Sequence, residues 1–335
     1  MGGLVALAHE RVIEIGGMPI LVRTESLEFA RMLEDRYGEF VIADAPPAVV
    51  ELEVELIREA GSGPRNSESG IQNSESDAQD FGVENDADES VNVRMEAGRW
   101  VIERGDFRAE WDPQTRRGWV RQRASPYAID GVLRILHSLI LAREGGFLVH
   151  AASAVRNGRA FVFAGVSGTG KTTLARLAPP DVTLLTDEIS YVRAGVRRPE
   201  LEVRSEELGV QRLGANPISQ ITNHQSQMDN RQSAIGNRQS YEAFGTPFAG
   251  ELAKLGHKIR APLAALFLLK QGPENRIEPL SEAEAVRELM RHVLFFTHDE
   301  ELVVMVFNSI CSFVKQNSVR RLVFTPDARV WELIA

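Results

Sequence analysis

The stretch Gly165-Val-Ser-Gly-Thr-Gly-Lys-Thr172 decides the fold of this 335-residue chain. It fits the pattern G-x-x-x-x-G-K-[ST] at every position, and composition alone would give about 0.003 such matches in this chain. The apolar residues from Arg159 to Ala164 predict a buried strand before it, and Thr172 to Leu177 predict a helix after it that stops at Pro179. A strand, a glycine-rich loop and a helix are the setting in which backbone N–H groups surround phosphate oxygens.

We therefore expect this loop to bind a nucleoside triphosphate, with ATP and Mg²⁺ as the ligands. The glycines allow the backbone to bend around the phosphates, Lys171 would bridge the β- and γ-phosphates, and the Thr172 hydroxyl would reach Mg²⁺. The alternative is a glycine-rich turn followed by a surface lysine. The residues expected to contact the nucleotide are Gly165, Ser167, Gly168, Thr169, Gly170, Lys171, Thr172 and Thr173.

Two acidic residues, Asp187 and Glu188, follow a second apolar stretch that begins at Val182. Phosphate-loop enzymes place a carboxylate for Mg²⁺ at the end of a neighbouring strand. We expect Glu188, Asp187 and Thr172 to form the metal site, and Asp187 to orient or deprotonate an acceptor hydroxyl as well. The alternative is that the two carboxylates simply begin a solvated loop.

An apolar stretch from Phe147 to Val155 precedes the loop and carries His150. It is joined to the strand that enters the loop by Asn157-Gly158, which is a strong signal for a tight hairpin, so the two strands should be antiparallel. We expect His150 to lie near the γ-phosphate, as a catalytic candidate with Asp187 and Lys171. The alternative is a histidine that is satisfied within the core.

This series of features resembles the HPr serine kinase/phosphorylase group and its kinase-like relatives, which share a fold with phosphoenolpyruvate carboxykinases. The resemblance is specific over Gly146 to Val192, where His150 stands fifteen residues before Gly165, and weaker over Thr246 to Ile334. It implies an α/β (α+β) P-loop kinase domain. It also implies an ATP- and Mg²⁺-dependent phosphotransferase that acts on a serine-type hydroxyl of a peptide or protein.

The chain departs from that group after the acidic pair. The segment Glu202 to Val210 is only a loose echo of the glycine-rich signature that serves phosphorolysis, so the resemblance does not imply a phosphorylase. Arg204 and Arg260 are candidates for an arginine that stabilises the transferred charge. Two other functions stay open: a non-catalytic nucleotide sensor or peptide-binding subunit, and an ATPase that drives conformational work.

The alternation of apolar and polar residues divides the chain into two predicted domains. Residues 1–125 predict a smaller antiparallel β-rich module with one helix, and residues 126–335 predict the kinase-like domain, which begins with a helix over Ala128 to Glu144. Two polar tracts, 61–90 and 216–240, interrupt these domains. The first holds eight acidic residues and one basic residue, and the second repeats a short Asn-to-Ser motif every seven residues. Without apolar periodicity, the first is expected to be a disordered acidic insertion and the second a solvated low-complexity insertion.

Charge and hydropathy exclude several partners. Lys and Arg number 38 against 47 Asp and Glu, and a net charge of −9 disfavours nucleic acid and anionic lipid. No apolar run approaches the roughly 18 residues of a membrane span, so we expect a cytoplasmic protein. Cys311, the single cysteine, cannot form an internal disulfide and lies in an apolar run, where we expect it to be buried. A peptide or protein acceptor is the expected partner, and the formation of a homo-oligomer stays open.

Overall fold

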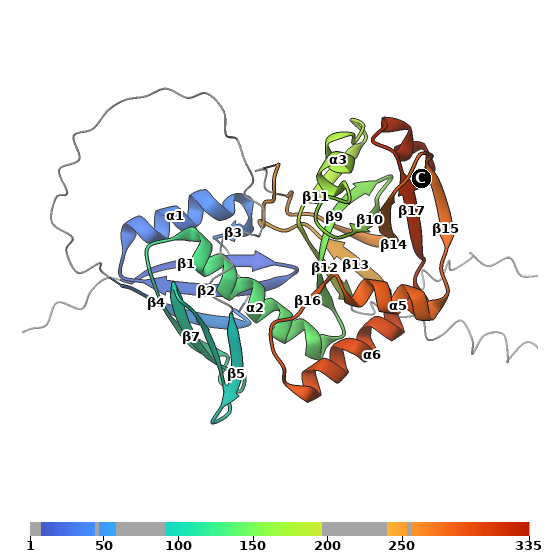
Figure 1. Ribbon diagram of the computed structural model, residues 1–335. Helices are drawn as coiled ribbons and strands as arrows, with labels where there is room; N and C mark the ends of the chain where they lie inside the picture. Colours follow the sequence, from blue (N-terminus) through green and yellow to red (C-terminus); the bar gives the residue numbers. More distant parts are fainter. Residues whose placement is uncertain (1–7, 44–46, 58–90, 196–239, 253–255, 335) are drawn as a thin grey trace, which may run out of the picture. The chain divides into compact units, whose positions relative to one another are not determined.

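The computed structural model describes residues 8–43, 47–57, 91–195, 240–252 and 256–334 as a mixed α/β structure with two sheets (Figure 1). The two polar tracts of the sequence analysis lie outside the described residues, apart from Ser240. The prediction that they are insertions therefore stays a prediction.

The first sheet has eight strands in the order β3-β1-β2-β4-β8-β7-β6-β5. The strands are β1 (His9–Ile15), β2 (Met18–Thr24), β3 (Val41–Ile42), β4 (Val50–Leu56), β5 (Asn92–Glu96), β6 (Arg99–Arg104), β7 (Phe107–Asp112) and β8 (Arg117–Gln122). The expectation of an antiparallel module is wrong for β4, which pairs in parallel with both β2 and β8. The sheet is mixed because the chain crosses over through helix α1 (Leu27–Tyr37) before it forms β4.

The apolar positions of these alternating strands face inward. Trp100, Phe107 and Trp111 are buried, as expected for residues of a sheet core. Helix α1 begins after Ser26, whose hydroxyl accepts a hydrogen bond from Phe29 N, and η1 (Gly38–Phe40) follows it. The one helix predicted in the N-terminal module is therefore confirmed, and Ser26 caps its N-terminus.

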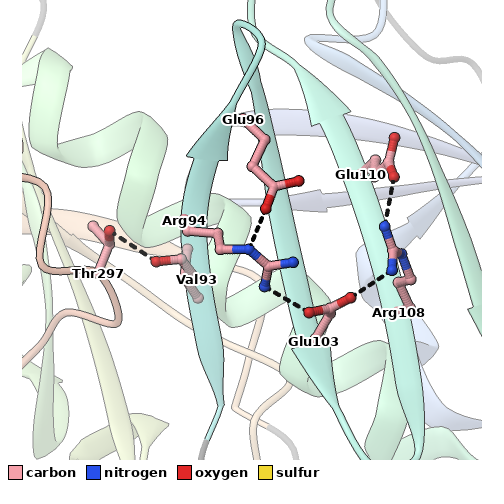
Figure 2. Close-up of polar contacts among 7 residues, drawn as sticks. All are labelled: Val93, Arg94, Glu96, Glu103, Arg108, Glu110 and Thr297. Atoms are coloured by element: carbon pink, nitrogen blue, oxygen red, sulfur yellow. Dashed lines mark hydrogen bonds and ion pairs between the residues drawn. The ribbon is translucent and has the colours of Figure 1, made fainter.

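The outer face of β5, β6 and β7 carries a row of ion pairs (Figure 2). Glu103 contacts Arg94 on one side and Arg108 on the other, and Arg108 also reaches Glu110. At the same strand edge, the Thr297 hydroxyl donates a hydrogen bond of 3.1 Å to Val93 O, which ties a C-terminal segment to this sheet.

Helix α2 (Pro126–Glu144) packs against elements of both halves of the described chain. It begins after Ser125, at the position where the second domain was predicted to start, and most of its residues are buried. One continuous cluster of buried apolar side chains includes members of the first sheet, of α2 and of the second sheet. The two predicted domains therefore share a core.

The second sheet contains a closed circuit of five strands, a small barrel. β10 pairs antiparallel with β9 and parallel with β14, and β12 and β13 connect β9 to β14 on the other side. The strands of the sheet are β9 (Phe147–Arg156), β10 (Arg159–Ala164), β11 (Val182–Thr186), β12 (Ile189–Ala194), β13 (Tyr241–Phe244), β14 (Arg260–Gln271), β15 (Arg276–Pro279), β16 (Val293–Leu294) and β17 (Val319–Phe324). The β9–β10 hairpin was predicted, and Asn157 and Gly158 have the positive φ values that its tight turn needs.

Helices cover this sheet. They are α3 (Lys171–Arg176), α5 (Glu282–Met290), α6 (Glu300–Gln316) and the 3₁₀ turn η2 (Ala328–Leu333). Trp331 of η2 is buried, packs edge-on against Phe163, and donates a hydrogen bond of 3.2 Å to Leu174 O at the end of α3. Cys311 lies on α6 and is half-buried, so the expectation of full burial is wrong.

Candidate functional site

The phosphate loop follows the carboxyl end of β10, and the acidic pair follows the carboxyl end of β11, at the same end of the second sheet. Both strands pair with β9 and run antiparallel to it, so they point in the same direction. Ala164, the last residue of β10, pairs with Ala151, and Thr186, the last residue of β11, pairs with Ser153. The segments that follow β10 and β11 therefore leave the sheet near His150, which precedes Ala151 on β9 and pairs with Ile189.

The loop from Gly165 to Gly170 has the backbone that its glycines make possible. Gly168 and Gly170 have φ values of +76° and +102°. A Cβ at Gly165 would lie 2.3 Å from the Thr169 hydroxyl, so only glycine leaves room for the turn to close. The side chain of Gln271 supports the loop from β14 through a hydrogen bond of 2.8 Å to Gly168 O.

Free backbone donors lie at the start of α3. The first hydrogen bond within this helix runs from Leu174 N to Gly170 O at 2.8 Å, so the N–H groups of Lys171, Thr172 and Thr173 have no acceptor within the helix. Because α3 is only six residues long, it would bind a phosphate mainly through these N–H donors, and its dipole would add little. Ser167 and Gly168 are exposed on the loop, where a phosphate can approach.

Lys171 is buried at the base of this loop. Its ammonium group donates hydrogen bonds to Gly165 O at 2.9 Å and to Val166 O at 3.2 Å. Burial lowers the pKa of Lys171, while the charges of Glu251 and Glu188 raise it. A lysine that reaches back to the first carbonyls of the loop keeps its charge beside the loop, where a phosphate site would need it.

Asp187 is buried and is bound by a distant segment of the chain. One carboxylate oxygen accepts a hydrogen bond from Gly250 N at 2.9 Å, and the other accepts one from Leu252 N at 2.9 Å. The same segment is tied to β11 by the Thr186 hydroxyl, which donates to Phe248 O at 3.3 Å. Asp187 therefore positions this segment, and each oxygen keeps a lone pair for a further donor or metal.

Glu188 occupies a different environment from its neighbour. Burial raises the pKa of Glu188, and the charge of Asp187 raises it further, whereas the positive charges of Arg134 and Lys171 lower it. Its backbone O accepts a hydrogen bond of 2.8 Å from Ala151 N, which fixes it against β9. The positive charges of Arg134 and Lys171 therefore both act on the Glu188 carboxylate.

His150 has a second histidine beside it. Its backbone N–H donates a hydrogen bond of 2.7 Å to His292 O. Burial lowers the pKa of His150 to about 4, helped by the charges of Lys171, His292 and Arg134, and burial lowers the pKa of His292 as well. Both imidazoles are neutral at pH 7, so His150 can exchange a hydrogen bond with a ligand but adds no positive charge.

Sequence reasoning missed three residues of this site: Arg134, Glu251 and His292. Asp130 and Arg134 are charged residues within the largely apolar, buried part of α2, and charges in a buried helix are a signal that could have found Arg134. Of the arginines that were named, Arg204 lies outside the described residues. Arg260 begins β14, at the opposite end of that strand from Gln271, and pairs with Glu242, so it lies away from the phosphate loop.

The predicted metal ligands are of the kind that hold Mg²⁺ together with phosphate and water, and not of the kind that enclose a metal with protein ligands alone. Mg²⁺ is commonly held by one or two carboxylates together with phosphate oxygens of the substrate. Within the described ranges, no group of three or more His, Cys, Asp or Glu residues is arranged to hold a metal. Asp187, Glu188 and Thr172 supply two carboxylates and a hydroxyl, which suits an ion that completes its shell with phosphate and water.

No helix in the part of the chain that the structure describes is long and apolar enough to cross a membrane. No protein-family model and no curated protein matches this chain. A function for it is therefore argued from the sequence motif and from the geometry of the site.

Proposed function

We propose that the protein is an ATP- and Mg²⁺-dependent phosphotransferase of the HPr kinase/phosphoenolpyruvate carboxykinase type, which phosphorylates a serine-type hydroxyl on a peptide or protein. One observation carries the proposal. The parallel direction of β10 and β11 on either side of β9 brings Lys171, the Asp187–Glu188 pair and His150 to the same edge of the sheet. Phosphoryl transfer depends on the orientation of the reactants and on the neutralisation of phosphate charge. A phosphate loop with its lysine and a pair of carboxylates can supply both.

Each residue has a role in this reaction. The loop and Lys171 bind the triphosphate, and Thr172 and Glu188 hold Mg²⁺, which neutralises phosphate charge when it is bound. The acceptor oxygen attacks the γ-phosphorus, the bond from that phosphorus to the bridging oxygen breaks, and ADP leaves. Asp187 accepts the proton of the acceptor hydroxyl through a lone pair that its backbone hydrogen bonds leave free.

Nucleotide binding is the first test. Calorimetry with MgATP should show that Lys171→Ala weakens binding by about 10- to 100-fold, because a charge-assisted phosphate contact is lost. Lys315→Ala is the matched control: it removes an exposed lysine of α6 just before β17, at the opposite edge of the sheet from the loop. Equal affinities of wild type and Lys171→Ala would contradict the proposal.

Phosphate transfer is the second test, with ATP labelled at the γ-phosphate and a library of serine-containing peptides. Glu188→Gln removes a charge that faces Lys171 and Arg134, and should lower transfer by about 10²–10⁴-fold. Asp187→Asn changes the structure as well as the charge. The amide nitrogen of Asn would face the N–H of Gly250 or of Leu252, and the hydrogen bond that this N–H donates to Asp187 would be lost. It should reduce transfer by a similar factor and also lower the unfolding midpoint.

A nucleotide sensor without catalysis is the second candidate. The observation in its favour is that both oxygens of Asp187 already bind the backbone of residues 250–252, as a purely structural carboxylate would. A sensor would bind MgATP with the same dependence on Lys171 but transfer no label to any peptide. Transfer that Glu188→Gln abolishes would rule the sensor out.

A further inference from the structure

An arginine of α2, Arg134, carries a charge that nothing in the described part of the chain neutralises by direct contact. Its guanidinium carbon lies 4.8 Å from the centre of the Phe248 ring, which is a cation–π contact. Its Nε is buried and has no hydrogen-bond acceptor. Arg134 is half-buried and, among the described residues, has neither an ion pair nor a hydrogen bond, although a buried donor such as its Nε is costly to leave without an acceptor.

The position of Arg134 is fixed on the side of the acidic pair. The carbonyl of Phe248, the residue under its guanidinium, accepts the hydrogen bond from Thr186, and Asp187 follows directly. Arg134 therefore lies beside the segment that binds Asp187, on the side of the site that carries the acidic pair. Its positive charge also contributes to the lowered pKa of His150.

The carboxylate that could have paired with Arg134 is already occupied. Asp130 lies one helical turn before Arg134 on α2, the spacing at which opposite charges pair. Its two oxygens instead accept hydrogen bonds from the Tyr37 hydroxyl at 2.6 Å and from Arg36 Nη2, both at the end of α1. Arg36 and Tyr37 of α1 thus bind Asp130 and leave Arg134 free to bind a ligand.

We propose that Arg134 is the residue that binds the γ-phosphoryl group of ATP and follows it through transfer. The inference rests on the proposed function. A planar guanidinium with several donors matches phosphate oxygens, and a cation beyond the loop lysine is a recurring part of phosphoryl-transfer sites. With both imidazoles neutral, Arg134 and Lys171 are the two positive charges that the described site offers to the triphosphate.

The test compares MgATP with MgADP, because only ATP has a γ-phosphate. Arg134→Met keeps an unbranched side chain over Phe248 and removes the charge. It should weaken MgATP binding by about 10- to 100-fold in calorimetry while changing MgADP affinity by less than about threefold. Arg134→Lys should recover part of the MgATP affinity. MgADP binding also shows that each variant is folded.

The matched control is Arg143→Met on the same helix. Arg143 also stacks on an aromatic ring, Trp100, at 6.0 Å, but it is exposed and belongs to the first sheet's side of α2. It should leave both affinities unchanged. Equal changes of MgATP and MgADP affinity in Arg134→Met would overturn the proposal. Absence of MgATP binding in the wild type would instead refute the proposed function itself.

A second set of variants tests the role of α1. Arg36→Ala frees an oxygen of Asp130, which can then pair with Arg134, so the preference for MgATP over MgADP should fall. Adding Asp130→Asn to Arg36→Ala removes the competing charge and should restore that preference. A purely structural role of Arg36 predicts no rescue, and that result would overturn the positioning role of Asp130.

Discussion

The phosphate loop leaves no room for a side chain at residue 170. The variant Gly170→Ala tests how far the stability of the protein and its binding of MgATP depend on that packing. A Cβ there would lie 2.6 Å from Phe324 Cζ, about 1 Å inside a normal contact of about 3.5–4 Å. Phe324 is buried at the end of β17 and cannot move away freely. The φ of +102° adds strain for any residue with a Cβ.

The two effects together should cost about 2–5 kcal/mol. We expect a lower free energy of unfolding in urea, and a loss of MgATP affinity to the extent that the loop shifts to relieve the overlap. The matched control is Gly168→Ala, because Gly168 also has a positive φ, +76°, but a Cβ there meets no atom within 4 Å. It should cost only the backbone strain, about 1–2 kcal/mol.

Phe324→Leu in the Gly170→Ala background provides a further check. The shorter side chain should relieve part of the overlap, so the double variant should be more stable than the sum of the two single changes predicts. Equal costs for Gly170→Ala and Gly168→Ala would refute the packing argument. Wild-type stability and MgATP affinity in Gly170→Ala would refute the loop geometry altogether.

Three other changes test separate parts of the structure. The pKa of His150 falls from 6.5 in the unfolded chain to about 4 in the folded one, so its contribution to stability is complete above pH 6.5 and is lost as the pH falls toward 4. His150→Gln should therefore reduce the proton uptake on unfolding by up to one in this range, and an unchanged pH dependence of stability would contradict it. Trp331→Phe removes the buried hydrogen bond to Leu174 O and should cost about 1–3 kcal/mol in urea unfolding, whereas a neutral result would show that this contact is not needed. Arg108→Ala breaks two of the ion pairs of Figure 2, those with Glu103 and Glu110, and should leave the unfolding midpoint within experimental scatter at physiological salt. A large shift would mean that the row acts as a network.

Much of the local structure could be predicted because it depends on neighbours in sequence. Asn157-Gly158 predicts the β9–β10 turn, since both residues accept positive φ. Alternation predicts which side of a strand is buried, as Trp100 and Trp111 show. It does not predict which strand lies alongside. For that reason the parallel pairing of β4 with β2 and β8 was missed.

The candidate site likewise has features that local sequence patterns predict and features that depend on contacts between distant residues. Sequence patterns predicted the phosphate loop, its lysine, the hairpin before it and the acidic pair after it, because each is a short pattern with a local physical meaning. The contacts of residues 250–252 with Asp187, of Arg134 with Phe248 and of α1 with Asp130 could be found only in the folded chain. These contacts join residues far apart in the chain, and whether a buried charge is paired or left available depends on which distant segments supply its hydrogen-bond partners.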